Sequence, residues 1–463
     1  MLTPTDQSCL HQRRHQLGQQ FEGQALLWSG VAPSRNFAAN QFPFRASSHF
    51  LYLAGLPLQN AVIGLEAGQL TLFWDEPHPD TALWHGPSLS RAEIADQIGA
   101  ETHLPLSAVS SWASHAATLP VPSSATHQQQ IEWLGRPVPP IQGSQDQESN
   151  RDHHLANALI QLRLQQDEFA LAQLRQAAEI TVAAHLRGMR STLNHTSEAA
   201  IRAEIESVMM AHQCPTAYAS IVTVHGEVLH NDAYPHALAP GDLLLVDAGA
   251  ETPLGWAADV TRTWPVSGQF SATQRDLYDL VLAAHDACIA AIQPGVEFRD
   301  LHLLAAQTIA SGLVDIGILK GQPEALVERD AHALFFPHGI GHLLGLDVHD
   351  MEDLGDLAGY APGRQRCDRR GLRYLRLDRP LRPQMLVTIE PGFYQIPALL
   401  QNPDLRQQYG DCVNWDRLAQ FEDVRGIRIE DDVLVTPEGC QVLTSALPTQ
   451  APEVEAYVQG STA

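Results

Sequence analysis

The sequence predicts a two-domain protein of mixed α/β (α+β) class. The first observation is length, because 463 residues exceed what a single typical hydrophobic core holds. The second is that, in both halves, short apolar runs alternate with segments of helical periodicity. The third is a shift to Pro, Gln, Ser and Gly between residues 120 and 150, which indicates a linker or a surface excursion. We therefore expect one domain over residues 1–160 and a second over residues 161–463.

The first half predicts an α/β layer domain. Strands are expected at Ala25–Ser29, Ala61–Leu65 and Gln69–Trp74, and a helix at Ser90–Gly99, which has a Ser at its start and a Gly at its end. The aromatic-rich segment from Phe42 to Leu53 suits either the core or a contact with a neighbouring subunit's site. No Gly-rich phosphate loop occurs here, so we expect no nucleotide chemistry from this domain.

The second half begins with helices and then turns to strands. A long helix is expected from Arg151 to Met189, and a second helix opens at Thr196 or Ser197, which serves as its N-cap. Strands are expected at 220–224, 243–251, 256–266, 385–394 and 424–436. Helices are expected at Ala272–Ile292 and Asp300–Ile316, and an irregular insertion at 351–375.

Charge and cysteine content exclude several classes of protein. The net charge of −24 argues against a nucleic-acid or anionic-membrane surface, both of which need clustered Lys and Arg. The six cysteines are scattered with no C-x-x-C pair, which is typical of reduced thiols in the cytoplasm. The N-terminus has no signal-peptide pattern, and no apolar run approaches 18 residues, so we expect a cytoplasmic protein.

The stretch P-H-G-I-G-H-L-L-G-L-D-V-H-D, from Pro337 to Asp350, concentrates three histidines among glycines and aliphatic residues. Histidine carries protons near pH 7 and is the commonest nitrogen ligand for metals. Any one of His338, His342 and His349 alone suits a hydrogen-bonded core histidine. Three together, with acidic strand ends on both sides in the chain, favour a functional site.

Four carboxylates fall on or beside apolar strands. The segments Leu238–Gly249 and Leu381–Gly392 align without a gap, pairing Asp247 with Glu390, which suggests a faint internal duplication or a coincidence of common turn chemistry. Asp259 lies on the return strand of a hairpin closed around Pro253–Gly255, and Glu430 on the last apolar strand. A buried carboxylate must be paired, protonated or bound to a metal.

Such crowding requires cations. Two divalent ions would supply +4 against the −4 of these carboxylates and lower the pKa of a shared water. Four carboxylates and one imidazole favour a hard ion such as Mn(II), with Co(II) and Zn(II) as alternatives. The expected chemistry is hydrolysis by a metal-bridging hydroxide.

Together these motifs carry a family resemblance. D-A-G-A-E, A-D-V-T-R-T-W-P-V, H-G-I-G-H-L-L-G-L-D-V-H-D, T-I-E-P-G-F-Y and G-I-R-I-E-D-D-V-L-V-T resemble the five ligand motifs of the pita-bread metallopeptidases, in the aminopeptidase P and prolidase branch. The segment F-P-F-R-A-S-S-H-F-L-Y-L is similar to that branch's creatinase-like amino domain. The resemblance implies a creatinase-like N-terminal domain followed by a pita-bread catalytic domain, and a homodimer.

The resemblance also implies roles for individual residues. The metal ligands would be Asp247, Asp259, His342, Glu390 and Glu430, with Asp259 and Glu430 bridging. Glu390 would also accept a proton, while Arg428 would orient the carboxylates. The histidines that line the substrate site would be His230, His338 and His349.

The substrate class implied is a peptide with an Xaa-Pro bond, and the finer choice rests on one loop. Arg376 matches an arginine with which prolidases bind the free carboxylate of a dipeptide, although eight arginines between 364 and 382 equally suit a basic surface loop. Gln384 stands where the family usually has Gly in a turn. We therefore predict an Xaa-Pro dipeptidase. Alternatives are an aminopeptidase P acting on longer peptides and, more remotely, a metal-free peptide-binding module.

Overall fold

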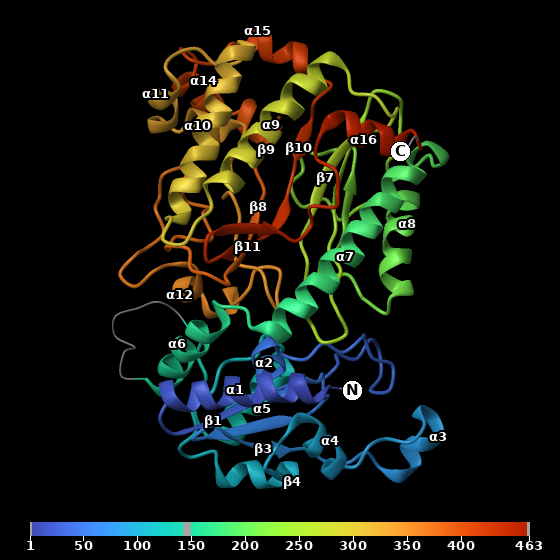
Figure 1. Ribbon diagram of the computed structural model, residues 1–463, viewed down its shortest axis with the longest axis vertical. Coiled ribbons are helices and arrows are strands. Elements are labelled where there is room, and N and C mark those ends of the chain that lie inside the picture. Colours follow the sequence, from blue (N-terminus) through green and yellow to red (C-terminus); the bar gives the residue numbers. More distant parts are fainter. Residues whose placement is uncertain (1, 142–149, 461–463) are drawn as a thin grey trace. The chain divides into compact units, whose positions relative to one another are not determined.

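The chain forms two compact units in the computed structural model, which describes residues 2–141 and 150–460 (Figure 1). The first unit consists of Met1–Ala172 together with the later segment Met351–Ala358. The second consists of Gln173–Asp350 and Gly359–Ala463. The change of unit therefore falls inside helix α7 (Glu168–Ser191), beyond the boundary expected at residue 160.

A four-stranded sheet organises the first unit. Strands β1 (Gln24–Trp28), β2 (Val62–Glu66) and β3 (Gln69–Phe73) pair antiparallel, and β4 (Thr102–Leu104) joins β3 in parallel. The first three lie within one residue of the predicted strands. The helices of this unit are α1 (Pro4–Gln20), α2 (Ser48–Ala54), α3 (Ala82–His85), α4 (Arg91–Ile98), α5 (Ser124–Leu134) and α6 (Arg151–Arg163).

Local signals set two of these helices. The Ser90 side chain accepts from the backbone N–H of Glu93, whose carboxylate accepts from the Ser90 N–H, and Gly99 ends α4 in the left-handed region at φ 64°. The predicted helix at 90–99 is thereby confirmed. In the aromatic-rich segment, α2 is buried throughout whereas Phe42 is exposed, so the core interpretation holds for 48–54.

The predicted linker is wrong in part, because helix α5 lies within it. Gln130 is fully buried and explains why this polar stretch is structured. Its side-chain amide accepts from the backbone N–H of Val121 (3.0 Å) and donates to the carbonyl of Leu119 (2.9 Å). Buried amides stabilise only when their hydrogen bonds are made, and here they are. Residues 142–149 of the predicted linker lie outside the described residues.

The single helix predicted from Arg151 to Met189 is also wrong, because the chain forms α6 and α7 with a break at 164–167. Asp167 begins the new helix, since its carboxylate accepts from the backbone N–H of Ala170 (2.9 Å). The same carboxylate pairs with Arg13, whose Nε lies 2.6 Å from Oδ2 and whose Nη2 lies 2.7 Å from Oδ1. An ion pair with residue 13 thus overrides a continuous helical pattern.

The segment Met351–Ala358 contributes a carboxylate that contacts a buried histidine of the first unit. His49 Nε2 lies 2.9 Å from Asp353 Oδ2, and Arg163 Nη1 donates to the other ring nitrogen of His49 (2.9 Å). Burial alone would raise the pKa of Asp353, but His49 and Arg163 hold this pKa at about 2. The expected irregular insertion at 351–375 therefore begins with residues that complete the other unit's fold.

Three small sheets organise the second unit. Strands β5 (Ile221–Thr223), β6 (Leu243–Asp247) and β7 (Thr261–Pro265) form one sheet, and β8 (Leu386–Ile389), β11 (Asp431–Thr436) and β12 (Gly439–Val442) another. Strand β9 (Gly392–Tyr394) pairs with β10 (Gly426–Arg428). The two late strands predicted from sequence are therefore each interrupted, at Glu390 and at Glu430.

Helices surround these strands, and α9 and α10 lie side by side along the sheets (Figure 1). They are α8 (Glu198–Ala211), α9 (Ala272–Ala291), α10 (Phe298–Ile316), α11 (Pro323–Glu328), α13 (Pro397–Leu400), α14 (Pro403–Gln408), α15 (Trp415–Leu418) and α16 (Ala451–Val458). Helix α12 (Asp356–Gly359) instead lies at the end of the segment that belongs to the first unit. Ser197 caps α8 as predicted. Within the described ranges, no helix has the length and apolar character needed to cross a membrane.

Candidate metal centre and active site

Strand ends position the four carboxylates that the sequence singles out. Asp247 is the last residue of β6 and pairs with Thr261 at the start of β7, so Asp259 lies just before the return strand. The turn closes as predicted, with the Gly255 N–H donating to the Thr252 carbonyl (2.8 Å). Glu390 follows β8, and Glu430 immediately precedes β11. Each carboxylate therefore lies at the end of a strand or directly beside one.

His342 joins these carboxylates from the glycine-rich stretch. Potential ligand atoms of Asp259, His342 and Glu430 all lie within 4.8 Å of one another. The Nδ1–H of His342 donates to the Leu343 carbonyl (2.9 Å), which leaves Nε2 facing Asp259 Oδ2 at 3.3 Å. Such a backbone partner fixes the tautomer of a histidine that binds metal through its other nitrogen.

Glycine allows this stretch to lie directly against β8. A Cβ on Gly341 would stand 2.0 Å from the Thr388 carbonyl oxygen, so no larger residue fits. The Thr388 N–H donates to the His342 carbonyl (3.0 Å), and the His342 N–H donates to Thr388 Oγ1 (3.2 Å). The spacing of glycines around the histidines therefore reflects close backbone packing that places the imidazole.

Hydrogen-bonding partners compensate the burial of the two aspartates to different degrees. Arg428 Nη2 donates to Asp247 Oδ2 (2.5 Å), and the Tyr218 hydroxyl lies 2.5 Å from Asp247 Oδ1 and 2.6 Å from Asp259 Oδ1. Burial would raise the pKa of Asp259, but His342 and the Tyr218 hydroxyl bring this pKa below its usual value. For Asp247, burial outweighs Arg428 and the pKa is raised.

The two glutamates are less well compensated. Burial raises the pKa of Glu430 well above its usual value, and the charges of Asp259, Glu390 and Asp247 raise it further. Burial likewise raises the pKa of Glu390 to about 7, against the opposing effect of His342 and Arg428. Crowded carboxylates of this kind are stabilised by divalent cations. The donor set of four carboxylates and one imidazole therefore fits a divalent metal centre.

A chain of hydrogen bonds connects the carboxylates to a histidine. Arg428 Nη1 donates to the Tyr394 hydroxyl (3.0 Å), which lies 2.8 Å from His338 Nε2. His338 Nδ1 is 2.8 Å from the Gly339 carbonyl, so Nδ1 carries the proton and Nε2 accepts from Tyr394. Burial and then Arg428 lower the pKa of His338 to about 3, which makes this imidazole neutral at pH 7.

His349 and His230 complete the set of predicted histidines. The His349 ring stands edge-on to His342, with centroids 4.5 Å apart. Burial lowers its pKa to about 3, and the charges of His342 and Arg376 add to this effect. His230 is exposed at the edge of the same cavity.

One cavity of about 530 Å³ brings all the predicted site residues together. Its volume lies within the range typical of small-molecule sites. Its lining includes every residue proposed from sequence, namely His230, Asp247, Asp259, His338, His342, His349, Arg376, Glu390, Arg428 and Glu430. Apolar side chains form another part of the wall, among them Leu229, Ile396 and Leu399. The structure separates none of the predicted residues from this cavity.

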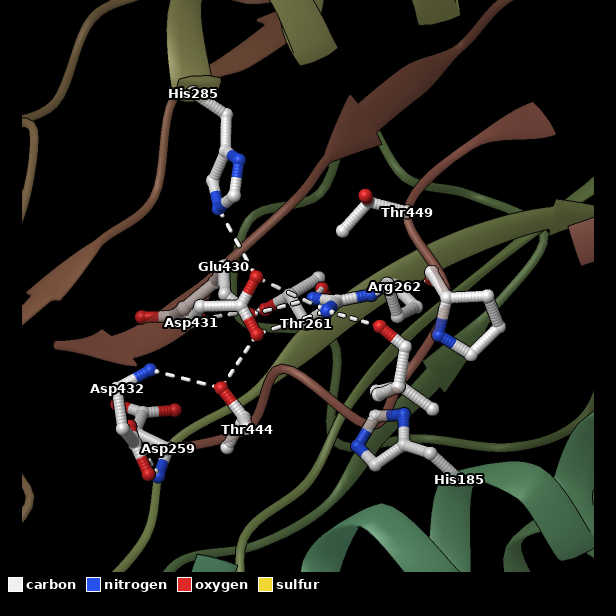
Figure 2. A network of polar contacts seen from close by, with 12 residues as sticks. His185, Asp259, Thr261, Arg262, His285, Glu430, Asp431, Asp432, Thr444 and Thr449 are labelled. Atoms are coloured by element: carbon white, nitrogen blue, oxygen red, sulfur yellow. Dashed lines mark hydrogen bonds and ion pairs between the residues drawn. The ribbon is translucent and has the colours of Figure 1, made fainter. Parts of the chain in front are cut away.

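A buried polar network lies behind the ligands, and the sequence did not reveal it. Figure 2 shows the Asp431 carboxylate facing Arg262, His285 and Thr444. Arg262 Nη2 donates to Asp431 (2.8 Å), and Arg262 Nη1 donates to the Glu430 carbonyl (2.7 Å). His285 Nε2 lies 3.0 Å from Asp431 Oδ2. The network therefore fixes the backbone that carries Glu430.

Tyr218, Tyr394 and Thr261 are the contacting residues that the sequence did not single out. Thr261 Oγ1 donates to Glu430 Oε2 (2.7 Å) and accepts from Arg428 Nε (3.0 Å). Thr261 lies two residues after Asp259 and Tyr394 four after Glu390, so proximity to predicted ligands was the available signal. Tyr218 lies 29 residues before Asp247 in the chain, and no spacing pattern indicated it.

Comparison with known proteins identifies the family. Residues 172–437 match metallopeptidase family M24, and residues 10–119 match the aminopeptidase P N-terminal domain. The chain belongs to metallopeptidase family M24. A Coccidioides posadasii protein named probable Xaa-Pro aminopeptidase is 32% identical over 90% of this chain and 88% of its own length. A Talaromyces stipitatus protein of the same name is 30% identical over 95% of this chain and 94% of its own length.

Solved structures agree with this assignment. Zinc-substituted aminopeptidase P of E. coli, in complex with product, superposes with a TM-score of 0.78 at 26% identity and covers 99% of both chains. Aminopeptidase PepP of Pseudomonas aeruginosa gives a TM-score of 0.78 at 28% identity, covering 98% of both. This M24 protein is therefore a metallopeptidase with the two-domain aminopeptidase P fold, and family membership implies a divalent metal centre.

Proposed function

We propose that this M24 metallopeptidase is an Xaa-Pro aminopeptidase that removes the residue before proline from the N-terminus of peptides. The observation that carries the proposal is the single cavity in which all the predicted ligands, histidines and Arg428 converge. The names of the relatives supply the substrate class and favour an aminopeptidase over the dipeptidase predicted from sequence. Two divalent cations, with Mn(II) as the first choice, would be held by Asp247, Asp259, His342, Glu390 and Glu430.

The residues suit hydrolysis of a bond to proline. That bond is a tertiary amide without an N–H, so recognition through a substrate N–H is lost. When bound, the cations polarise the carbonyl and lower the pKa of water. Glu390 serves as proton acceptor, since no described residue donates a hydrogen bond to its carboxylate and the side chain remains 18% exposed to the cavity.

The neutral histidines contribute hydrogen bonds and proton transfer. His338 is oriented by Gly339 and Tyr394, which fixes its ring relative to Glu390, with Nδ1 3.6 Å from Glu390 Oε2. His349 presents an imidazole beside His342, and His230 faces the cavity from its exposed edge. Their assigned tasks are to hold the substrate and to move protons at the attacked carbonyl and the leaving proline nitrogen.

Metal removal and readdition test the proposal. Protein stripped with a chelator should not cleave Ala-Pro-Ala, and added Mn(II), Co(II) or Zn(II) should restore release of alanine. Metal analysis of the reconstituted protein should give about two ions per chain if the five ligands act as assigned. Cleavage that survives complete removal of metal would contradict the proposal. A stoichiometry of one would contradict the dinuclear arrangement alone.

A dipeptidase is the second candidate, and the position of Arg376 favours it. Arg376 lines the cavity, and its charge lowers the pKa of His349, so its guanidinium is close to the catalytic groups. A guanidinium in that place suits the free carboxylate of a dipeptide such as Ala-Pro. Comparing kcat/KM for Ala-Pro and Ala-Pro-Ala separates the two candidates.

The variant Arg376→Ala sharpens that comparison. A charge-assisted hydrogen bond is worth about 1.5–3 kcal/mol, so kcat/KM for Ala-Pro should fall about 10- to 150-fold. Ala-Pro-amide should be affected much less, because it has no carboxylate at that place. Arg175→Ala removes a charge from α7 outside the cavity lining and serves as the control. An equal, small loss on every substrate would exclude a carboxylate-binding role.

A further inference from the structure

The arginine-rich loop between α12 and β8 divides into two groups of side chains. Arg364 pairs with Glu297 and Asp378, and Arg369 pairs with Asp330. Four others, Arg366, Arg370, Arg373 and Arg376, line the cavity of the metal centre. The interpretation of this loop as merely a basic surface is therefore incomplete, because half of its arginines face the site.

Hydrogen bonds and buried leucines fix the backbone of this loop, which carries the arginines that line the cavity. His302 Nε2 donates to the Gly371 carbonyl (2.6 Å), and the Tyr360 hydroxyl donates to the Leu375 carbonyl (2.7 Å). Leu372 and Leu375 are buried. Backbone bonds from Leu372 and Arg373 to the Arg369 carbonyl (3.0 and 2.8 Å) form successive turns. Anchored loops of this kind present side chains without a large ordering cost.

Charge balance makes this part of the cavity positive. The acidic residues in the lining are Asp247, Asp259, Glu390 and Glu430, which are the assigned metal ligands. Two divalent cations would offset their four charges, and Arg428 is already paired with Asp247. In the described part of the chain, Arg370 and Arg373 form no ion pair with a carboxylate. An excess of positive charge therefore remains along the loop.

We propose that Arg370 and Arg373 form a subsite for negatively charged residues that follow the proline of the substrate. The ligand class is a peptide with carboxylate side chains one and two positions after proline. This inference rests on the proposed Xaa-Pro aminopeptidase function and adds a substrate preference to it. The carboxylate-binding role of Arg376 toward dipeptides is separate, since it concerns proline's own carboxylate.

The direction of the substrate supports this placement. Catalysis at the metal ligands requires the scissile carbonyl to lie at the carboxylate end of the cavity, so later residues of the peptide extend away from it. Arg366 and Arg373 are exposed and Arg370 is half-buried, which places this group toward solvent. Exposed ion pairs are individually weak, but several fixed positive charges facing one chain produce a measurable selectivity.

Four amidated peptides test the subsite: Ala-Pro-Ala-Ala, Ala-Pro-Glu-Glu, Ala-Pro-Lys-Lys and Ala-Pro-Ser-Ser. Metal-loaded enzyme should cleave the Glu peptide about tenfold more efficiently than the Ala peptide, and the Lys peptide less efficiently than either. The Glu preference should shrink as salt is raised, because partly exposed charges are screened. The Ser peptide controls for polarity without charge. Equal kcat/KM for all four peptides would overturn the inference and leave the proposed function intact.

Variants of the two arginines test whether these residues cause the preference for the Glu peptide. In Arg370→Gln/Arg373→Gln the Glu-to-Ala ratio should fall to about one to two, whereas Arg370→Lys/Arg373→Lys should keep most of it because the charge remains. Arg175→Ala removes one positive charge elsewhere and should leave the ratio unchanged. A ratio that persists in the double Gln variant would place the selectivity at other residues and refute this subsite.

A binding measurement separates failure of the subsite from failure of the enzyme assignment. Calorimetry with Pro-Glu-Glu-amide and Pro-Ala-Ala-amide requires no turnover. The first should bind about tenfold more tightly to wild type, and the two should bind alike to the double Gln variant. If no peptide is cleaved but this difference is found, the aminopeptidase assignment is wrong and the anionic subsite stands. Equal binding of both peptides to wild type refutes the subsite directly.

Discussion

The carboxylates assigned as metal ligands form two pairs, the aspartates (Asp247 and Asp259) and the glutamates (Glu390 and Glu430). Both pairs lie at strand ends, but their surroundings differ. The aspartates have close polar partners: Arg428 donates to Asp247, the Tyr218 hydroxyl lies within hydrogen-bond distance of both carboxylates, and His342 Nε2 lies 3.3 Å from Asp259. The glutamates have only the Thr261 hydroxyl at Glu430, and no described donor at the Glu390 carboxylate. The protein itself therefore compensates more of the negative charge on the aspartate side of the site. On the other side, charge depends on the cations.

The largest expected effect comes from removing the negative charge of one of the glutamates. Glu430→Gln should leave a folded protein with about one metal ion or fewer and should lower kcat by at least about 10³-fold, because the cations supply most of the electrostatic stabilisation. Metal analysis and a peptide assay check this. Asp259→Asn changes the other carboxylate expected to bridge the two cations and should have the same effect on metal content and kcat. Full activity of either variant would contradict their assignment as ligands.

Without metal, variants of the two pairs should change stability in opposite directions. Asp247→Asn removes the carboxylate that compensates buried Arg428 and should lower the free energy of unfolding by roughly 3–5 kcal/mol. Glu430→Gln removes a carboxyl whose pKa is raised by burial and by the neighbouring carboxylates, so folding no longer has to bury its charge or bind a proton, and the substitution should raise the free energy of unfolding. Urea unfolding of chelator-treated protein measures both. Equal destabilisation by the two substitutions would abolish the distinction drawn between the pairs.

The pH dependence of the metal-free protein sharpens the comparison further. The folded state retains a proton on Glu390 up to about pH 7, whereas the unfolded chain loses it near pH 4.5, so the folded state binds more protons between these values. This group's contribution to stability is therefore present below pH 4.5 and declines as pH rises toward 7. Metal-free Glu390→Gln should match wild type at pH 4.5 and exceed its free energy of unfolding by about 2–3 kcal/mol at pH 7.

The difference between these two proteins is the relevant quantity, because buried neutral histidines shift both profiles alike. His338 and His349, with pKa values of about 3, stabilise the folded state as pH rises, and this effect cancels in the comparison. Restoring Mn(II) should reverse the order at pH 7, since the cations require the Glu390 carboxylate. A difference that is independent of pH would show that Glu390 titrates normally in the folded protein.

The smallest expected effect concerns the turns that precede β6 and β8, the two strands whose sequences align. Gly241 precedes β6 with φ 99°, and Gln384 occupies the aligned position before β8 with φ 68°, a left-handed conformation that disfavours side chains. Gln384→Gly should raise the free energy of unfolding by about 0.5–1 kcal/mol. Thermal unfolding of the metal-loaded protein checks this, and Gly241→Gln should lower stability by a similar amount. A destabilised Gln384→Gly protein would show that the Gln side chain makes a compensating contact.

Sequence patterns predicted the structure correctly where residues close together in the chain determine the local geometry. The capping residues Ser90 and Ser197 set helix starts, and the turn at 253–255 brought Asp259 beside Asp247. The predicted site residues all reach one cavity because strand ends and a glycine-rich segment constrain them strongly. These are features in which neighbouring residues in the chain determine the geometry.

Features that depend on distant partners were not predictable from the sequence. The break between α6 and α7 follows from Arg13 binding Asp167, which lies 154 residues later. Tyr218 and the Asp431 network reach the ligands through tertiary contacts that no spacing reveals. The preference for dipeptides was inferred from one arginine in a loop with eight, and the relatives favour the aminopeptidase alternative instead.

The segment Met351–Ala358 has a consequence for how the chain folds during its synthesis. The first unit needs Asp353 as the partner of His49, yet about 180 residues separate the end of its main segment at Ala172 from Met351. At a ribosomal rate of about 5–20 residues per second, Arg163 waits roughly 10–40 s for that carboxylate, and His49, which precedes Asp353 by 304 residues, waits roughly 15–60 s. The N-terminal unit is therefore completed only after most of the catalytic unit has emerged, so the order of synthesis couples the maturation of the two.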